Sequence, residues 1–149
     1  AYSGSDTIVK SDIDAVTVPV LSAAVFQITN HLSDGNYGIA MVKLRQLLAM
    51  QEEPLGILGA IGMHFRRLGA AKTLLDNGKN ASDLVQLCRI SEYAARKTVS
   101  VASRFRASFY ARALELILET DRRIKTSYDT PERLLEILIL NLAQEMNNG

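Results

Sequence analysis

TPERLLEILILNLAQEM, residues 130–146, predicts a helix with apolar side chains around most of its circumference. The run Asp129–Glu132 supplies a capping residue, a first-turn proline and an acid, so the helix should extend from about Pro131 to Met146. A surface helix of a monomer needs only one apolar stripe, and this helix has more. It is therefore either a central helix of a bundle or a helix that also packs against another subunit.

The rest of the chain shows the same helical periodicity. Apolar positions follow a 4-3-4 spacing from Leu21 to Leu32 and predict a first core helix. Further helices are expected from about Met41 to Gln51, from Pro54 to Leu75, after Asn80 or Ser82, after Ser91, and from about Ala107 to Lys125. Only residues 15–20 resemble a strand, and Pro19 interrupts them. These patterns predict an all-α fold, a compact bundle of about five to seven helices.

Composition limits the classes of protein to which the chain can belong. Hydrophobic residues make up 48% and charged residues 22%, which excludes a disordered chain. The single cysteine, Cys88, excludes an internal disulfide and a cysteine-based zinc site, and one free thiol suits a reducing cytoplasm. His31 and His64 alone offer little for a histidine-based metal site, so we expect no metal and no cofactor. The sequence shows no targeting or membrane-spanning segment, which favours a cytoplasmic protein.

The length of 149 residues suits one main domain with a core of its own. The chain begins with Ala1 and not with methionine, which leads us to expect a piece of a longer protein. We interpret residues 1–18 as the tail of a preceding domain with a linker, and residues 19–149 as a helical domain.

The balanced total charge of +1 hides an uneven distribution. From His64 to Arg106 there are nine basic and three acidic residues, a net charge of +6, which leaves −5 for the rest of the chain. Such a run is either a solvated face or a surface that meets an acidic partner or a phosphate backbone.

Residues 82–104 also resemble a helix-turn-helix, with a short helix, a tight turn at Arg89-Ile90 and a second helix. Arg96, Lys97 and Arg104 would lie on or near its reading helix. The usual turn glycine is missing, and many structural helix pairs share this spacing. A free-standing helical DNA-binding protein is therefore kept as the alternative function.

No motif for catalysis is visible. There is no phosphate-binding glycine loop, His-Glu-x-x-His motif, nucleophile elbow or Cys–His pairing. Gly56, Gly59 and Gly62 lie inside a predicted helix, where we expect them to allow close helix packing. Asp121 and Lys125, one turn apart, should form a solvated ion pair. We therefore predict that this chain is not an enzyme.

A longer pattern is more specific than any of these pieces. Its parts are Val25-Phe26-Gln27-Ile28-Thr29, Glu52-Glu53-Pro54-Leu55-x-x-Leu58, His64-Phe65-Arg66-x-Leu68, Lys72-x-Leu74-Leu75, Ile90-Ser91-x-Tyr93-x-Ala95-Arg96-Lys97, Ala102-x-Arg104-Phe105, Ala113-Leu114-x-Leu116, Glu119-x-Asp121-x-x-Ile124-Lys125-Thr126 and Leu135-Glu136-x-Leu138-Ile139. In this order they resemble the C-terminal region of the delta subunit of bacterial DNA polymerase III, a clamp-loader subunit. The resemblance covers about residues 20–145.

The resemblance implies a helical collar domain that assembles the clamp-loader ring. In that family the collar packs against the collars of the tau/gamma and delta-prime subunits, and the ring loads the sliding clamp on primed DNA during replication. The sliding clamp is contacted by an N-terminal domain of delta, and residues 6–18 resemble the end of its middle, lid domain. The parent would be a non-catalytic subunit of the DNA polymerase III holoenzyme, and residues 82–104 become a structural helix pair.

Two sets of residues are candidates for contacts. The surplus apolar surface of the last helix makes Leu135, Leu138, Ile139 and Leu142 our predicted subunit interface. Tyr128 lies in the polar link before that helix, where its ring could stack on a DNA base while Lys125 pairs with a phosphate. The alternative is a Tyr128 ring packed across the helix junction with its hydroxyl hydrogen-bonded. Any DNA contact would be minor beside the protein contacts.

Overall fold

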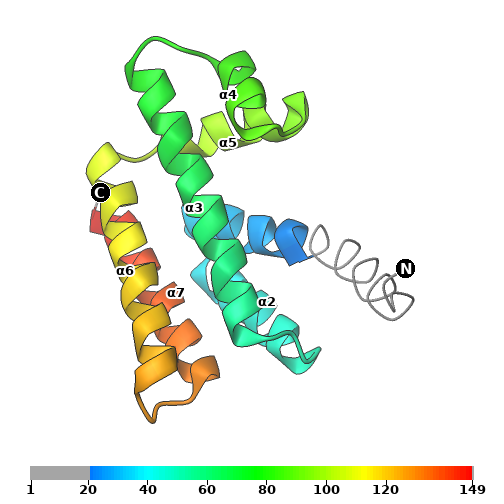
Figure 1. The fold of residues 1–149 in the computed structure, drawn as a ribbon, viewed down its shortest axis with the longest axis vertical. Coiled ribbons are helices and arrows are strands. Elements are labelled where there is room, and N and C mark those ends of the chain that lie inside the picture. Colours follow the sequence, from blue (N-terminus) through cyan, green and yellow to red (C-terminus); the bar gives the residue numbers. More distant parts are fainter. Residues whose placement is uncertain (1–20, 149) are drawn as a thin grey trace, which may run out of the picture.

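A computed structural model describes residues 21–148, and all the regular secondary structure in that part is helical (Figure 1). The first helix covers residues 21–33. The others are α2 (Tyr37–Ala49), α3 (Pro54–Asp76), α4 (Ala81–Cys88), α5 (Glu92–Ala102), α6 (Ala107–Thr126) and α7 (Pro131–Asn148). The predicted all-α fold is confirmed, and the helices lie close to the ranges that their periodicity predicts.

Local sequence signals explain where the central helices begin. Pro54 occupies the first turn of α3, where its missing N–H costs nothing. Asn80 and Asp83 form a capping box at α4: the Asn80 side chain accepts from the Ser82 amide at 3.0 Å, and Asp83 accepts from the Asn80 amide at 2.9 Å. The Ser91 hydroxyl accepts from the amide of Ala94 at 3.1 Å and caps α5.

Left-handed backbone occurs at Gly35, Gln51, Gly78 and Arg89, and the last two frame α4. Gly78, at φ +75°, follows the end of α3, as the Asn77-Gly78 pair predicts. Arg89 takes φ +54° between α4 and α5, in the place where a helix-turn-helix usually has glycine. A non-glycine residue in this conformation costs about 1 kcal/mol. The tight turn expected at Arg89-Ile90 is therefore present, with a small strain.

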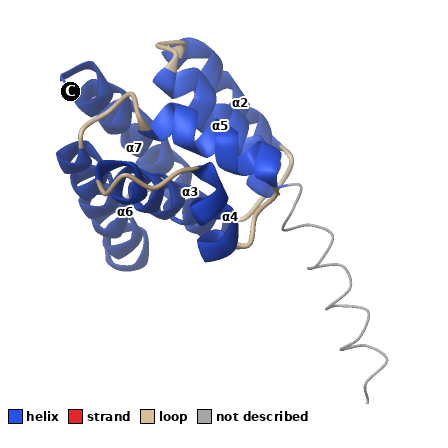
Figure 2. Cartoon of the chain, turned by 90° about the horizontal axis from the view of Figure 1, so that it is seen from above, coloured by secondary structure: helices blue, strands red, loops and turns tan. Residues whose placement is uncertain are grey.

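The core forms around α3, which packs against α4, α5, α6 and α7. Figure 2 shows α3 in the middle, with α6 and α7 on one side and α4 and α5 on the other. α3 and α6 run antiparallel, and the Phe65 ring of α3 lies 6.2 Å from the Phe109 ring of α6. A Cβ added at Gly62 would lie 3.6 Å from Ile117 of α6, whereas one at Gly59 would meet open space. The expectation of close packing therefore fits Gly62 and is wrong for Gly59.

The two ends of the molecule are built from different helices. Figure 1 shows α4 and α5 beside the C-terminal half of α3, and the turn between α6 and α7 at the opposite end. The residues that the sequence predicts for contacts with DNA are divided between these two ends. The fold therefore keeps the two DNA hypotheses far apart in space.

Candidate interaction surfaces

The structure places the predicted interface side chains in the core. Leu135, Leu138, Ile139 and Leu142 are only 0–1% exposed in the single chain. The reason is that α7 packs against α2, α3 and α6, so most of its circumference faces other helices of the same chain. Of the two explanations for its surplus of apolar residues, the central position accounts for these four. In the single chain these four side chains therefore have almost no surface left for contact with another subunit.

A different strip of α7 faces outward. Arg133, Leu140 and Gln144 are exposed, Ile137 is partly buried between them, and the exposed fraction of Leu140 is 57%. These positions follow helical spacing and form one line along the helix. Sequence reasoning missed Leu140 because periodicity alone does not tell a core stripe from a second, outer stripe. The sequence feature that indicates Leu140 is the second apolar stripe of this helix, because one stripe is enough to face the core.

The neighbouring helix α2 extends this outward surface. Arg45 of α2 donates to Glu136 of α7 at 3.2 Å, so these sides of the two helices lie together. Ile39 and Val42 lie within two turns of Arg45 and are 48% and 51% exposed. We call Ile39, Val42, Ile137 and Leu140 the outer apolar face. These are side chains that the core does not use and that a neighbouring protein could cover.

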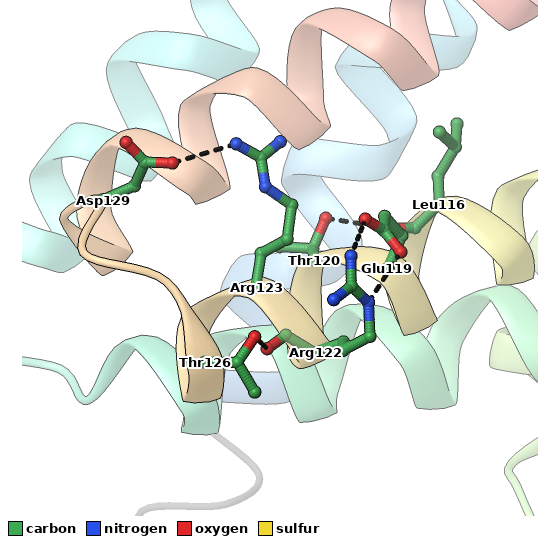
Figure 3. A network of polar contacts seen from close by, with 7 residues as sticks. All are labelled: Leu116, Glu119, Thr120, Arg122, Arg123, Thr126 and Asp129. Carbon is green, nitrogen blue, oxygen red and sulfur yellow. Dashed lines mark hydrogen bonds and ion pairs between the residues drawn. The ribbon is translucent and has the colours of Figure 1, made fainter.

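The turn between α6 and α7 is held by local polar contacts (Figure 3). Arg123 of α6 donates to Asp129 at 2.9 Å, and the Thr126 hydroxyl donates to the carbonyl oxygen of Arg122 at 2.7 Å. The Thr130 hydroxyl accepts from the amide of Arg133 at 3.4 Å and so satisfies a free donor in the first turn of α7. The turn that carries Tyr128 is therefore braced on both sides.

Tyr128 projects from this braced turn into solvent. Its relative exposure is 106%, so its ring is not packed across the helix junction. The packed-ring alternative is therefore wrong. Lys125 is exposed and its ammonium lies 3.1 Å from the Asp121 carboxylate, which confirms the predicted ion pair. An exposed ion pair of this kind is worth at most about 1 kcal/mol, so a phosphate could replace Asp121.

The α4–α5 pair is packed on the body of the protein. The buried side of α5 consists of Ala95, Thr98, Val101 and Ala102, and α5 packs against α3. Arg104 donates to Asp34 at 2.6 Å and is held at the surface of the bundle. Arg96 and Lys97 are exposed, and the Lys97 ammonium lies 5.5 Å from the centre of the Tyr93 ring. The three cations of the helix-turn-helix hypothesis are thus not presented as one set.

Many other charged groups pair at the surface. Arg122 lies 2.6 Å from Glu119, whose pKa is lowered mainly by that hydrogen bond, and Arg112 lies 3.1 Å from Glu115. His64 differs, because burial and the nearby Arg67 lower its pKa to about 4. Within residues 21–148, no His, Cys, Asp and Glu side chains gather in threes at a place that could hold a metal ion. None of the described helices combines the length and hydrophobicity that crossing a bilayer requires.

Comparison with known proteins points to one family. Residues 22–142 match the profile of the family described as DNA polymerase III delta subunit, C-terminal domain. The fold is similar to that of the Bacillus subtilis DNA clamp loader delta protein (YqeN), with a TM-score of 0.77 and 20% sequence identity over 83% of this chain. This chain covers 37% of the length of that protein. No curated protein is significantly similar in sequence. Neither comparison supports a helix-turn-helix DNA reader.

Proposed function

This chain belongs to the family formed by the C-terminal domain of the delta subunit of DNA polymerase III, and we propose that it is the collar domain through which a delta subunit joins a clamp-loader ring. The match over residues 22–142 is the observation that carries this proposal. The neighbours in the ring would be the tau/gamma and delta-prime subunits, and the assembled ring would load the sliding clamp on primed DNA. The domain itself would take part in the assembly of the ring and would not catalyse a reaction.

The outer apolar face of α2 and α7 is our proposed contact with a neighbouring collar. Ile39, Val42 and Leu140 are each about half exposed, and water leaves this surface when a neighbour covers it. Each apolar Å² removed from water stabilises the contact by about 25 cal/mol. The Arg45–Glu136 pair between the two helices would lie at this contact and help to set its register. This assignment keeps α7 as the interface helix and replaces the four buried residues by its outer strip.

Co-purification tests the assignment. The substitution Leu140→Asp places a charge in the proposed contact, and we expect it to abolish co-purification with the tau/gamma subunit. Leu140 is exposed, so the variant should keep the circular dichroism spectrum and melting temperature of the wild-type domain.

The matched control is Leu87→Asp, because Leu87 is 63% exposed on α4, away from α7. We expect this variant to assemble normally. Full assembly of the Leu140→Asp variant would show that the outer apolar face is not the contact.

Tyr128 is our proposed contact with primed DNA. Its ring stands free on a braced turn, a geometry that suits stacking on an unpaired base. Lys125, near the end of α6, would exchange its Asp121 partner for a phosphate. This contact would be small beside the protein contacts of the ring.

The test is the affinity of the assembled loader for primed DNA. Base stacking contributes about 1–3 kcal/mol, so Tyr128→Ala should weaken binding by about fivefold or more. Tyr93→Ala is the matched control, since Tyr93 is an exposed aromatic residue on α5, at the opposite end of the molecule. Equal affinities of wild-type and Tyr128→Ala loaders would exclude the stacking role.

The remaining assignments follow from the same family. Residues 1–18, which lie outside the described residues, would be the tail of the preceding lid domain with its linker, and residues 19–149 would be the collar. Contact with the sliding clamp would belong to an N-terminal domain of the full delta subunit. A replication subunit of this kind works in the cytoplasm, at the nucleoid.

A further inference from the structure

A cavity of about 520 Å³ lies outside both proposed contacts. It is bounded by the start of the helix at residues 21–33, the middle of α3 and the N-terminal end of α5. Its walls include Ala23, Phe26, His64, Arg67 and Ala94. Neither the outer apolar face nor the Tyr128 turn contributes to it, so the collar role leaves it without a function.

One wall of the cavity holds a buried histidine. His64 is 6% exposed, and its Nε2 atom has no hydrogen-bond partner in the described part of the chain. The Phe26 ring stands edge-on to the imidazole, with 5.0 Å between the ring centres. Because the pKa of His64 is about 4, the imidazole is neutral at pH 7 and adds no charge to this wall of the cavity. Its ring, beside that of Phe26, therefore contributes to an apolar wall.

One cationic side chain and one helix N-terminus border the same cavity. The Arg67 side chain lines it, and its guanidinium has Met63 Sδ, at 3.6 Å, as its hydrogen-bond acceptor. The first turn of α5 borders it too, and the amides of Glu92 and Tyr93 have no acceptor among residues 21–148. A helix N-terminus with free amides attracts a carboxylate. The carboxylate of Glu92 itself opposes this attraction.

Three further cations lie at the end of α4 and on α5, outside the walls of the cavity. Arg89, Arg96 and Lys97 are exposed, and within the described residues they form no ion pair. By contrast, Arg66, the neighbour of Arg67 on α3, lines the groove between α3 and α6 and not this cavity. A partly apolar cavity lined by Arg67, on the side of the molecule with a net positive charge, is complementary to an acidic segment that also carries a large apolar side chain.

We propose that this cavity binds an acidic peptide segment of a partner protein. An apolar side chain of the peptide enters between Phe26 and Ala94. The adjacent carboxylate binds Arg67 and the free amides at the start of α5. This site would recruit a further protein to the collar, and it is separate from the surface that we assign to ring assembly.

A fluorescence anisotropy titration of the 149-residue chain tests the proposal. The probe is a labelled peptide of four aspartates followed by glycine, leucine and phenylalanine. We expect saturable binding that is lost when the aspartates are replaced by asparagine and also when leucine and phenylalanine are replaced by serine. Both losses are required, because the site joins an apolar cavity to positive charge.

Variants then locate the peptide. Arg67→Met should weaken binding about tenfold, the effect of one lost charge-assisted hydrogen bond, while the matched control Arg66→Met should change it less than twofold. Ala23→Trp fills the cavity from an exposed position without changing any charge and should abolish binding. Glu92→Gln removes the opposing carboxylate and should strengthen binding about threefold.

Three outcomes would overturn the proposal. The first is the absence of binding at millimolar peptide. The second is binding that Arg66→Met weakens as much as Arg67→Met does, since that would indicate general attraction to a basic surface. The third is tighter binding of single-stranded oligothymidine that is lost in Ala23→Trp, which would assign the cavity to nucleic acid. We expect these variants to leave ring assembly unchanged, so failure here leaves the collar function intact.

Discussion

At the α6–α7 end of the molecule, three cations of α6 pair with nearby carboxylates, whereas three cations of the α4–α5 end do not. Arg122, Arg123 and Lys125 each lie within 3.1 Å of a carboxylate. Arg89, Arg96 and Lys97 at the other end form no ion pair among the described residues. In the folded chain, the net positive charge of residues 64–106 is therefore not fully neutralised by ion pairs at the α4–α5 end. Both ends expose charged side chains, but at the α6–α7 end most of the cations have a carboxylate partner.

The two ends also differ in how they are anchored. α7 buries seven side chains in the core, whereas α4 buries only Leu84 and α5 buries mostly small ones. The free energy that holds an element in place grows with the apolar area that it buries. We therefore expect the α4–α5 pair to open more readily than the rest of the bundle.

The largest effect is expected from truncating a buried leucine, and it should differ between the two ends of the molecule. Leu138→Ala in α7 should lower the free energy of unfolding by about 3–5 kcal/mol, because the cavity forms in the centre of the bundle. Leu84→Ala in α4 should instead open α4 and α5 while α6 and α7 stay folded. Urea unfolding measures the first effect, and amide hydrogen exchange locates the second.

Leu140→Ala provides the control for the first substitution, because Leu140 is on the same helix and 57% exposed. Its effect should be within about 0.5 kcal/mol. Loss of exchange protection throughout the chain in Leu84→Ala would mean that the two ends unfold as one unit.

The second effect depends on pH and concerns His64, which borders the α4–α5 end. Its pKa in the folded chain is about 4, below the ordinary value of about 6.5, so the unfolded chain binds the proton more tightly. Stability is therefore complete above pH 6.5 and falls by about 3 kcal/mol as the pH drops from 6.5 to 4. Urea unfolding between pH 7 and pH 4 measures this slope.

His64→Phe removes the titrating group and keeps an aromatic ring beside Phe26 and Phe65. The difference in stability between wild type and variant should therefore change with pH in that window. Parallel curves for the two proteins would contradict a buried neutral imidazole.

The smallest effect concerns the link between the two ends. The buried Tyr110 hydroxyl of α6 donates to the carbonyl oxygen of Ala102 at 2.8 Å and so completes the C-terminal end of α5. Burial raises the pKa of Tyr110, so the hydroxyl remains protonated as a donor. Tyr110→Phe should cost about 1 kcal/mol. Chemical denaturation measures this cost, and a stability equal to wild type would mean that α5 does not depend on the bond.

Helix positions were largely predictable because their signals are local. Pro54, Gly78, Asn80 and Ser91 mark helix ends through their own backbone and side-chain chemistry, and the structure confirms each of them. The family was also predictable, because its motifs recur in a fixed order along the chain. The left-handed conformation of Arg89 was not, because nothing in that residue favours it.

The candidate sites were predictable only where a side chain stands apart from the core. Tyr128 was found from its polar link, and its exposure agrees with that prediction. On α7, periodicity did not separate the buried Leu138 from the exposed Leu140, because the two are the same residue type two positions apart. The cavity beside His64 was missed because its walls come from three separate segments.

The amino-acid sequence alone determined the helices, their ends, the all-α class and the family, because periodicity, capping and ordered motifs act along the chain. Tertiary packing determined which leucines of α7 face the core, which cations find a carboxylate and where a cavity remains. These properties depend on the neighbours that each side chain meets after folding. Such neighbours are distant in sequence, as the Arg45–Glu136 and Arg104–Asp34 pairs show.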